Sequence, residues 1–343
     1  MRSIITTAAA SFVASAALVY LVRAFALRRA LFDRPNERSA HRVPTPRLGG
    51  IGIIAAFLTV GSYVNVSFGG GGAWPILAAV GIIAAVGIID DLRPLPARVR
   101  FVVQMTVAVA VVYARRDAVT VSLAPDFVPM WLLVPVLVLW IVWMTNLFNF
   151  MDGIDGLAGG QTLFAAAGLG VAAAVGGGTH AAMLLAVLGA ASAGFLVFNF
   201  PPASIFMGDA GSTAIGFFFA CVPLLPGGEG LGLQAVWVAI GLFILDATTT
   251  LARRLANGER WFEAHRSHWY QRPLRYGVPH RTITLAAYGG MALLAASAVA
   301  YVLVPGSSAG WLIAAPVIAF LLLAGLVVRL ERAALAAKLE GEP

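Results

Sequence analysis

Apolar residues fill long runs of this chain, and short polar segments separate them. Most runs approach 20 residues, the helix length needed to cross a hydrocarbon core of about 30 Å. Backbone groups in lipid must form hydrogen bonds within their own segment, so the runs predict helices rather than strands. We expect eleven transmembrane helices, at residues 4–22, 48–67, 74–90, 100–114, 129–145, 161–176, 180–198, 212–226, 230–250, 283–304 and 310–328.

Composition agrees with this pattern, since 60% of the residues are hydrophobic, 11% are charged and the mean hydropathy is +0.87. We therefore expect an all-α, polytopic membrane protein in which residues 1–343 form a single membrane-embedded domain. The first apolar run has no convincing small-residue cleavage site before Arg23, which favours a retained helix over a signal peptide. The one cysteine, Cys221, can form no intramolecular disulfide.

Basic residues lie almost entirely in alternate connections between the predicted helices. All lysines and arginines except Arg2, Arg115 and Arg116 fall on one side. The positive-inside rule places that side in the cytoplasm and the N-terminus outside. His180 is expected on the outer side, exposed to solvent.

Carboxylates near the ends of several predicted helices fall on the same side as the basic residues. They are Asp90 and Asp91 in "GIIDDLRPLP", Asp152 and Asp155 in "NLFNFMDGIDGLAGG", and Asp209 in "FMGDAGST". Asp246 lies a turn or two before the ninth connection, within reach of the same layer. Acids at helix ends are often merely interfacial, but five gathered from separate segments indicate a bound cation. Mg²⁺ typically uses one or two carboxylates together with substrate phosphates.

The glycines beside these acids let backbone N–H groups approach a phosphate, and the helices that follow add positive dipole ends. No P-loop motif is present. The residues alone therefore predict a metal-dependent site for a phosphorylated compound on the cytoplasmic face. The alternative is a transporter of a phosphorylated or anionic solute, because acids within membrane segments often mark ion pathways. A transporter site usually lies near the midplane, however, whereas these acids lie at helix ends.

Five motifs, in this order, resemble those of the polyprenyl-phosphate N-acetylhexosamine-1-phosphate transferases. They are "DRPNERSAHRVPTPRLGG" (33–50), "DDLRPLP" (90–96), "NLFNFMDGIDGLAGG" (146–160), "FNFPPASIFMGDAGST" (198–213) and "HRSHWYQRP" (265–273). The resemblance implies ten or eleven helices in the bacterial inner membrane, with a cytoplasmic active site. It also implies Mg²⁺-dependent transfer of a sugar 1-phosphate from a UDP-sugar to undecaprenyl phosphate, with release of UMP.

The resemblance also implies a role for each matching residue. Asp209 and Asp152 would hold the metal. Asp90 and Asp91 would be the catalytic pair near the lipid phosphate, one of which deprotonates it or otherwise assists its attack; the sequence does not decide which. Substrate binding would fall to Asn149, Asp155, Asn199, His265, Arg266 and His268. The basic residue that follows the acidic pair in the family corresponds to Arg98 or Arg100.

One motif departs from the pattern. Members that use N-acetylglucosamine resemble one another through "HxHH", whereas this chain reads "HRSHWYQR". That form resembles members that use 6-deoxy sugars, such as N-acetylfucosamine or N-acetylquinovosamine, in O-antigen synthesis. Expected partners are undecaprenyl phosphate, a UDP-sugar and membrane lipid, with no nucleic acid; a homodimer is left open. Direct transfer and a two-step route through an aspartyl-phosphate also remain open.

Overall fold

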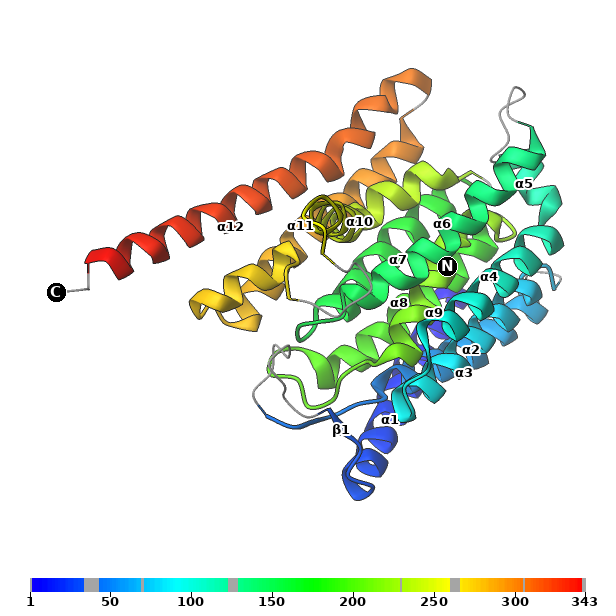
Figure 1. Ribbon diagram of the computed structural model, residues 1–343. Coiled ribbons are helices and arrows are strands. Elements are labelled where there is room, and N and C mark those ends of the chain that lie inside the picture. Colours follow the sequence, from blue (N-terminus) through cyan, green and yellow to red (C-terminus); the bar gives the residue numbers. More distant parts are fainter. Residues whose placement is uncertain are drawn as a thin grey trace.

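The protein is described by a computed structural model that covers residues 2–33, 43–68, 71–122, 129–228, 230–259, 266–304 and 306–340. The described chain is a helical bundle, with one two-residue pair of antiparallel strands at its edge (Figure 1). The helices are α1 (Arg2–Arg28), α2 (Gly49–Phe68), α3 (Trp74–Leu92), α4 (Ala97–Ala114), α5 (Arg116–Ser122), α6 (Met130–Phe150), α7 (Leu157–Val175), α8 (Thr179–Asn199), α9 (Asp209–Ala220), α10 (Gly232–Ala256), α11 (His280–Leu303) and α12 (Ala315–Glu340). Three 3-10 segments, η1 (Val222–Leu224), η2 (Trp269–Tyr276) and η3 (Gly306–Ala314), and strands β1 (Phe32–Asp33) and β2 (Thr45–Pro46) complete the elements.

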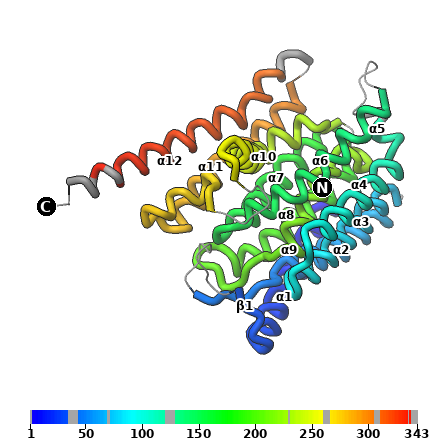
Figure 2. Tube along the Cα trace, in the orientation of Figure 1, coloured from blue at the N-terminus to red at the C-terminus, as the bar shows by residue number. Residues whose placement is uncertain are grey.

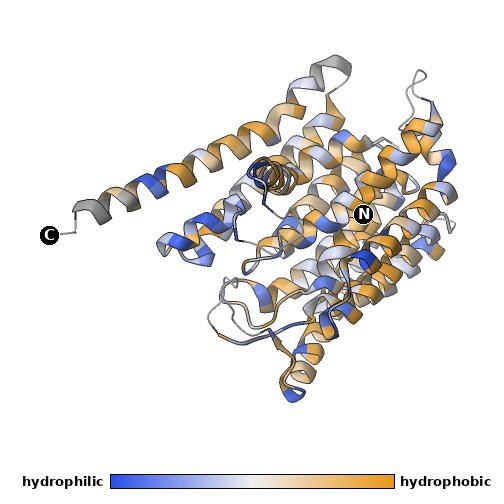
Figure 3. Ribbon diagram, in the orientation of Figure 1, coloured by the Kyte–Doolittle hydropathy of each residue, from blue (hydrophilic) through white to orange (hydrophobic). Residues whose placement is uncertain are grey.

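Ten helices in the described part of the chain are long and apolar enough to cross a membrane. The expectation of an all-α, polytopic membrane protein is thereby confirmed. Figure 3 shows that the helix bodies are largely hydrophobic, while hydrophilic residues are frequent in the segments that connect them. The part of α12 drawn in red extends beyond the neighbouring helices (Figure 2).

The eighth expected span, at 212–226, appears as a short helix followed by a 3-10 turn. Helix α9 has 12 residues, a length of about 18 Å. The chain nevertheless reaches the opposite end of the bundle, where Arg115 Nε donates a hydrogen bond to the carbonyl of Leu224 at 2.8 Å. Every residue of α9 from Ala210 to Ala220 is buried, so this helix packs against protein, between α3 and α6.

Helices α3, α6 and α8 end at the same end of the bundle at which α4, α7 and α9 begin, which we call the site end. Here the segment before α9 continues the β-pairing of the first loop. Phe206 N donates to the carbonyl of Pro46, and Gly49 and Gly50 donate to the carbonyls of Phe206 and Met207, each at 2.8 Å. A Cβ on Gly50 would lie 2.4 Å from the backbone of Gly211. Glycine is therefore required where these two motifs meet.

His180 does not match its predicted environment. The residue is 8% exposed at the start of α8, so the expectation of a solvated side chain is wrong. Its helix begins inside the packed end of the bundle, where the chain around Pro226 covers it.

Candidate active site

The carboxylate of Asp91 caps the helix that carries Asp209. Oδ1 of Asp91 accepts the backbone N–H of Asp209 at 3.0 Å, and Oδ2 accepts that of Ala210 at 3.1 Å. The first N–H groups of a helix lack partners within the helix, so a carboxylate at this point satisfies them and complements the dipole. Gly208 precedes α9 with φ +76°, and a Cβ there would lie 2.7 Å from Asp91. Asp91 is 6% exposed and thus fixes where Asp209 lies.

Asp90, Asp209 and Arg100 form a second set of contacts beside this cap. Nη1 of Arg100 lies 2.6 Å from Oδ2 of Asp90 and 3.2 Å from Oδ2 of Asp209. The backbone N–H of Leu95 donates to the other oxygen of Asp90 at 2.6 Å, which holds the short turn between α3 and α4. The Asp90 side chain is 9% exposed and that of Asp209 is 26% exposed. Asp209 is therefore the more accessible carboxylate of this pair.

Asp152 lies in the turn between α6 and α7, near the backbone N–H of Gly208 and the charge of Asp91. Loss of hydration raises the pKa of Asp152 to about 7, and the negative charges of Asp91 and Asp155 add to the shift. The turn therefore brings a carboxyl that binds a proton near neutral pH against the start of α9. A carboxyl of this kind would release its proton when a cation binds.

Asp155 and Asn199 fasten the same turn to neighbouring backbone. Oδ2 of Asp155 accepts the N–H of Ala203 at 3.0 Å, and Oδ1 lies 3.1 Å from Nδ1 of His280. Asn199, 4% exposed, accepts the N–H of Gly156 at 2.9 Å and donates to the carbonyl of Ile205 at 2.8 Å. Both side chains therefore position the turn, in contacts that the motif alone did not reveal.

The remaining predicted substrate-binding residues that the structure describes lie at the end of α6 and just before η2. Asn149 is partly exposed in the last turn of α6, where its carbonyl accepts the N–H of Asp152 at 3.1 Å. His268 is 4% exposed, and its Nδ1 lies 2.9 Å from Oδ1 of Asp246. The carbonyl of Arg266 accepts a hydrogen bond from the Arg275 side chain. His265 lies outside the described residues.

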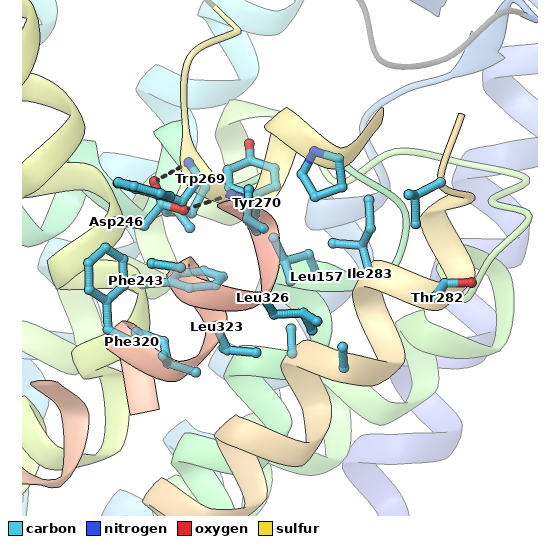
Figure 4. Close-up of a pocket in the computed structure, with 18 of the residues that line it drawn as sticks. Leu157, Phe243, Asp246, Trp269, Tyr270, Thr282, Ile283, Phe320, Leu323 and Leu326 are labelled. Atoms are coloured by element: carbon cyan, nitrogen blue, oxygen red, sulfur yellow. Dashed lines mark hydrogen bonds between the residues drawn. The ribbon is translucent and has the colours of Figure 1, made fainter. Parts of the chain in front are cut away.

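Asp246 caps η2 in the way that Asp91 caps α9. Its carboxylate accepts the N–H groups of Trp269 and Tyr270 at 3.1 and 3.0 Å (Figure 4). The hydroxyl of Tyr270 donates to the carbonyl of Phe150 at 3.1 Å, and a Cβ on Gly153 would lie 2.2 Å from that hydroxyl. Segment η2 is thereby held against the turn that carries Asp152. The sequence placed Asp246 near this layer but gave no sign of its partners.

The carboxylates fit a magnesium ion that is shared with a substrate. No group of three His, Cys, Asp or Glu side chains is placed to hold a metal by itself within the described residues. Mg²⁺ needs only one or two carboxylates when phosphates and water supply its other ligands. Oxygens of Asp90 and Asp209 already converge on one positively charged nitrogen. This donor set therefore suits Mg²⁺ when a phosphate supplies further ligands.

A cavity of about 130 Å³ lies between α10, α11, α12 and η2 (Figure 4). Its lining is largely apolar, including Phe243, Ile283 and Leu323, and the carboxylate of Asp246 at its edge is already bonded to η2. This cavity therefore suits a hydrocarbon group better than a sugar nucleotide, which needs polar partners.

Comparison with known proteins agrees with the motifs. Residues 73–226 match the model of glycosyl transferase family 4. The chain is 34% identical to the probable undecaprenyl-phosphate N-acetylglucosaminyl 1-phosphate transferase of Bacillus subtilis, over 78% of this chain and 76% of the relative. It is 31% identical to the decaprenyl-phosphate N-acetylglucosaminephosphotransferase of Mycolicibacterium smegmatis, over 84% and 80% of the two chains. Identity to the undecaprenyl-phosphate alpha-N-acetylglucosaminyl 1-phosphate transferase of Yersinia pestis is 30%, over 80% and 79%. The chain belongs to the polyprenyl-phosphate N-acetylhexosamine-1-phosphate transferases of glycosyl transferase family 4.

Proposed function

We propose that this protein transfers an N-acetylhexosamine 1-phosphate from a UDP-sugar to undecaprenyl phosphate and releases UMP. The observation that carries the proposal is the convergence of Asp90, Asp209 and Arg100 at the site end of the bundle. Carboxylates and a guanidinium in one place suit a diphosphate bound through a divalent ion. A transporter is not favoured, because these groups lie at helix ends and the chain belongs to a transferase family.

The proposed reaction is a direct displacement at phosphorus. An oxygen of the lipid phosphate attacks the phosphorus that carries the sugar, and the bond from that phosphorus to the bridging oxygen breaks. UMP leaves with the bridging oxygen, while the sugar–oxygen bond stays intact and keeps its configuration. Asp91 is a positioning residue in this scheme because backbone N–H groups hold both of its oxygens. Asp90 is then the carboxylate that would act as the base and take up the proton of the acceptor phosphate.

A two-step route through an aspartyl-phosphate has less support. It needs a carboxylate oxygen that is free to attack phosphorus. Both oxygens of Asp91 accept backbone N–H groups, and those of Asp90 accept Leu95 N–H and Arg100. The direct route leaves the backbone hydrogen bonds of both residues in place.

Mg²⁺ would be held by Asp209 with Asp90 or Asp152 as a second ligand. When bound, the ion supplies electrostatic stabilisation of the diphosphate and of the departing UMP. The chain itself provides the carboxylates, held at fixed positions by the caps and turns of the site end.

We propose that the protein lies in the inner membrane of a bacterium and that the site end faces the cytoplasm. Lysine and arginine support this orientation, because all but three lie in or beside the connections expected on this side from the sequence. UDP-sugars are cytoplasmic compounds, so the donor would reach the carboxylates from that side.

The identity of the sugar depends on two observations that favour different donors. The "HRSHWYQR" loop resembles that of members using 6-deoxy sugars for O-antigen-like polysaccharides, whereas the relatives named above act on N-acetylglucosamine. We assign the donor class as UDP-N-acetylhexosamine. The test compares turnover of UDP-N-acetylglucosamine with turnover of UDP-N-acetylfucosamine and UDP-N-acetylquinovosamine. A clear preference for UDP-N-acetylglucosamine would refute the prediction of a 6-deoxy sugar from this loop.

The decisive experiment follows the phosphorus next to the sugar. Purified protein in liposomes with undecaprenyl phosphate and Mg²⁺ receives UDP-sugar labelled at that atom, from the panel above. A sugar-phosphate transferase delivers the label to the organic lipid extract and releases UMP. A glycosyltransferase that breaks the sugar–oxygen bond would leave the label in UDP, and a transporter would accumulate intact UDP-sugar. Label that stays out of the lipid with every sugar tested would overturn the proposal.

A further inference from the structure

Arg100 lies where two carboxylates of the site converge. One nitrogen, Nη1, contacts Oδ2 of Asp90 and Oδ2 of Asp209, at 2.6 and 3.2 Å. The guanidinium group carries five N–H donors in a rigid fork. Its Nη2 and Nε form no hydrogen bond with any described residue, and the side chain is 36% exposed. Arg100 thus contacts both acids through one nitrogen, and its other donors have no partner among the described residues.

A divalent ion held by the same two oxygens would meet a guanidinium nitrogen that already contacts both of them. Mg²⁺ binds oxygen at about 2.0–2.1 Å, so its ligands must close around it. The hydrogen bonds from Nη1 draw on the same carboxylate charge that would hold the ion, so they oppose its binding. The ion and Arg100 therefore compete for one pair of oxygens.

We propose that Arg100 is a placeholder that exchanges with the divalent ion and then binds the donor. The ion displaces Nη1 from Asp90 and Asp209, and the released guanidinium contacts the diphosphate of the UDP-sugar. The second half of this inference rests on the proposed function, which supplies the diphosphate. Arginine binds phosphate through two parallel hydrogen bonds, and the long, partly exposed side chain can move without a change in α4.

The exchange has a consequence for the order of binding. Before the ion binds, Arg100 is hydrogen-bonded to the carboxylates, and this contact disfavours its binding to a phosphate. When the ion binds, Arg100 is released from the carboxylates and lies beside the position at which the ion attracts phosphate. Metal binding and donor binding are thereby coupled through one side chain, and the metal binds first.

The test measures two affinities in the Arg100→Gln variant. Mn²⁺, as a spectroscopic probe, is titrated into purified protein without donor or acceptor, and UDP-N-acetylhexosamine binding is then measured at saturating Mn²⁺. Loss of the competing charge-assisted hydrogen bonds should tighten Mn²⁺ binding by about tenfold or more. Loss of the phosphate contact should weaken donor binding by about tenfold or more. A purely structural role would weaken both, so weaker or unchanged Mn²⁺ binding would overturn the proposal.

Arg98→Gln is the matched control. Arg98 is exposed in the same turn of α4 and carries the same charge, so its replacement reports general electrostatics; we expect less than about a twofold change in either affinity. Equal tightening of Mn²⁺ binding in both variants would show repulsion rather than competition and would overturn the exchange.

Arg100→Lys provides a second variant if Arg100→Gln does not fold. It keeps the charge but lacks the fork, so donor binding should weaken at saturating Mn²⁺ while Mn²⁺ affinity stays within a few-fold of wild type. Unchanged donor affinity in Arg100→Lys would overturn the proposal. The Mn²⁺ titration contains no substrate, so its result is independent of the labelling experiment. Label transfer to lipid with unaltered Mn²⁺ affinity in Arg100→Gln would keep the proposed function and refute the exchange.

Discussion

Asp91 and Asp209 are 118 positions apart in the chain, yet the carboxylate of Asp91 accepts the backbone N–H of Asp209 at 3.0 Å. One acidic residue thereby fixes the start of the helix from which another projects. Asp246 bears the same relationship to η2, through Trp269 and Tyr270. Two of the acids at the site end thus build the site by capping helices.

The cap predicts a loss of stability when Asp91 is replaced. Asp91→Asn keeps one acceptor oxygen but turns an amide N–H₂ group toward a backbone donor. We expect the free energy of unfolding to fall by about 1–2 kcal/mol, as for the loss of a helix cap. Denaturant unfolding of the purified protein in detergent measures it.

Asp117→Asn is the control for this measurement. Asp117 is fully exposed in α5, so we expect a change within about 0.5 kcal/mol. A fully stable Asp91→Asn protein that has lost turnover would show that Asp91 acts chemically and is not mainly a cap.

Asp209→Asn should behave differently from Asp91→Asn. The cap uses the backbone N–H of Asp209, which this substitution retains, so stability should change little. Turnover should fall by about 10²-fold or more, because the carboxylate proposed to hold Mg²⁺ is lost. Initial rates over a Mg²⁺ series, with unfolding of the same samples, provide the check. A variant that keeps most of its activity at limiting Mg²⁺ would remove Asp209 from the metal site.

Asp152 predicts a dependence of stability on pH. Its pKa is raised from 3.8 to about 7 in the folded protein, so between these values the folded state holds a proton that the unfolded state has lost. The contribution of Asp152 to the free energy of unfolding therefore decreases as pH rises through this window, by at most about 1.4 kcal/mol per unit, and levels off above pH 7. Unfolding in metal-free buffer from pH 5 to 8 should show a steeper decline for wild type than for Asp152→Asn.

Mg²⁺ should alter this pH profile in a defined direction. A cation binds the ionised carboxylate, so stabilisation by added Mg²⁺ should grow as pH rises through about 7. Asp152→Asn should weaken that growth. An identical Mg²⁺ response in wild type and Asp152→Asn at every pH would exclude Asp152 as a ligand.

Much of the fold could be predicted from local pattern, because each long apolar run must satisfy its own backbone in a membrane. The eighth expected span, at 212–226, was not predicted correctly in this way. Helix α9 is buried on all sides by protein, so nothing requires it to reach the length of a lipid-facing helix. His180 was misjudged for a related reason, since position near a helix end does not reveal whether neighbouring loops cover it.

The site could be predicted as a set of motifs but not as a set of contacts. Spacing in the sequence does not show that Asn199 bonds to the backbone at Gly156 and Ile205. Nor does it decide between Arg98 and Arg100, which lie in the same turn of α4. Only the fold brings Arg100 to Asp209, 109 positions away. These contacts depend on how α3, α4 and α9 pack together, which no local pattern encodes.

The orientation of the bundle can be tested at the two ends of α10. Gly230 precedes this helix, and a side chain there would meet no atom within 4 Å; Asn257 follows it and is exposed. Single cysteines at these positions, in a Cys221→Ala background, should label from opposite sides of the membrane. If the basic side faces the cytoplasm, an impermeant thiol reagent added to intact cells with a permeable outer envelope should label Gly230→Cys. Asn257→Cys should react only after the membrane is opened. Labelling of Asn257→Cys alone in intact cells would invert the orientation, and labelling of both would show that α10 does not span the membrane.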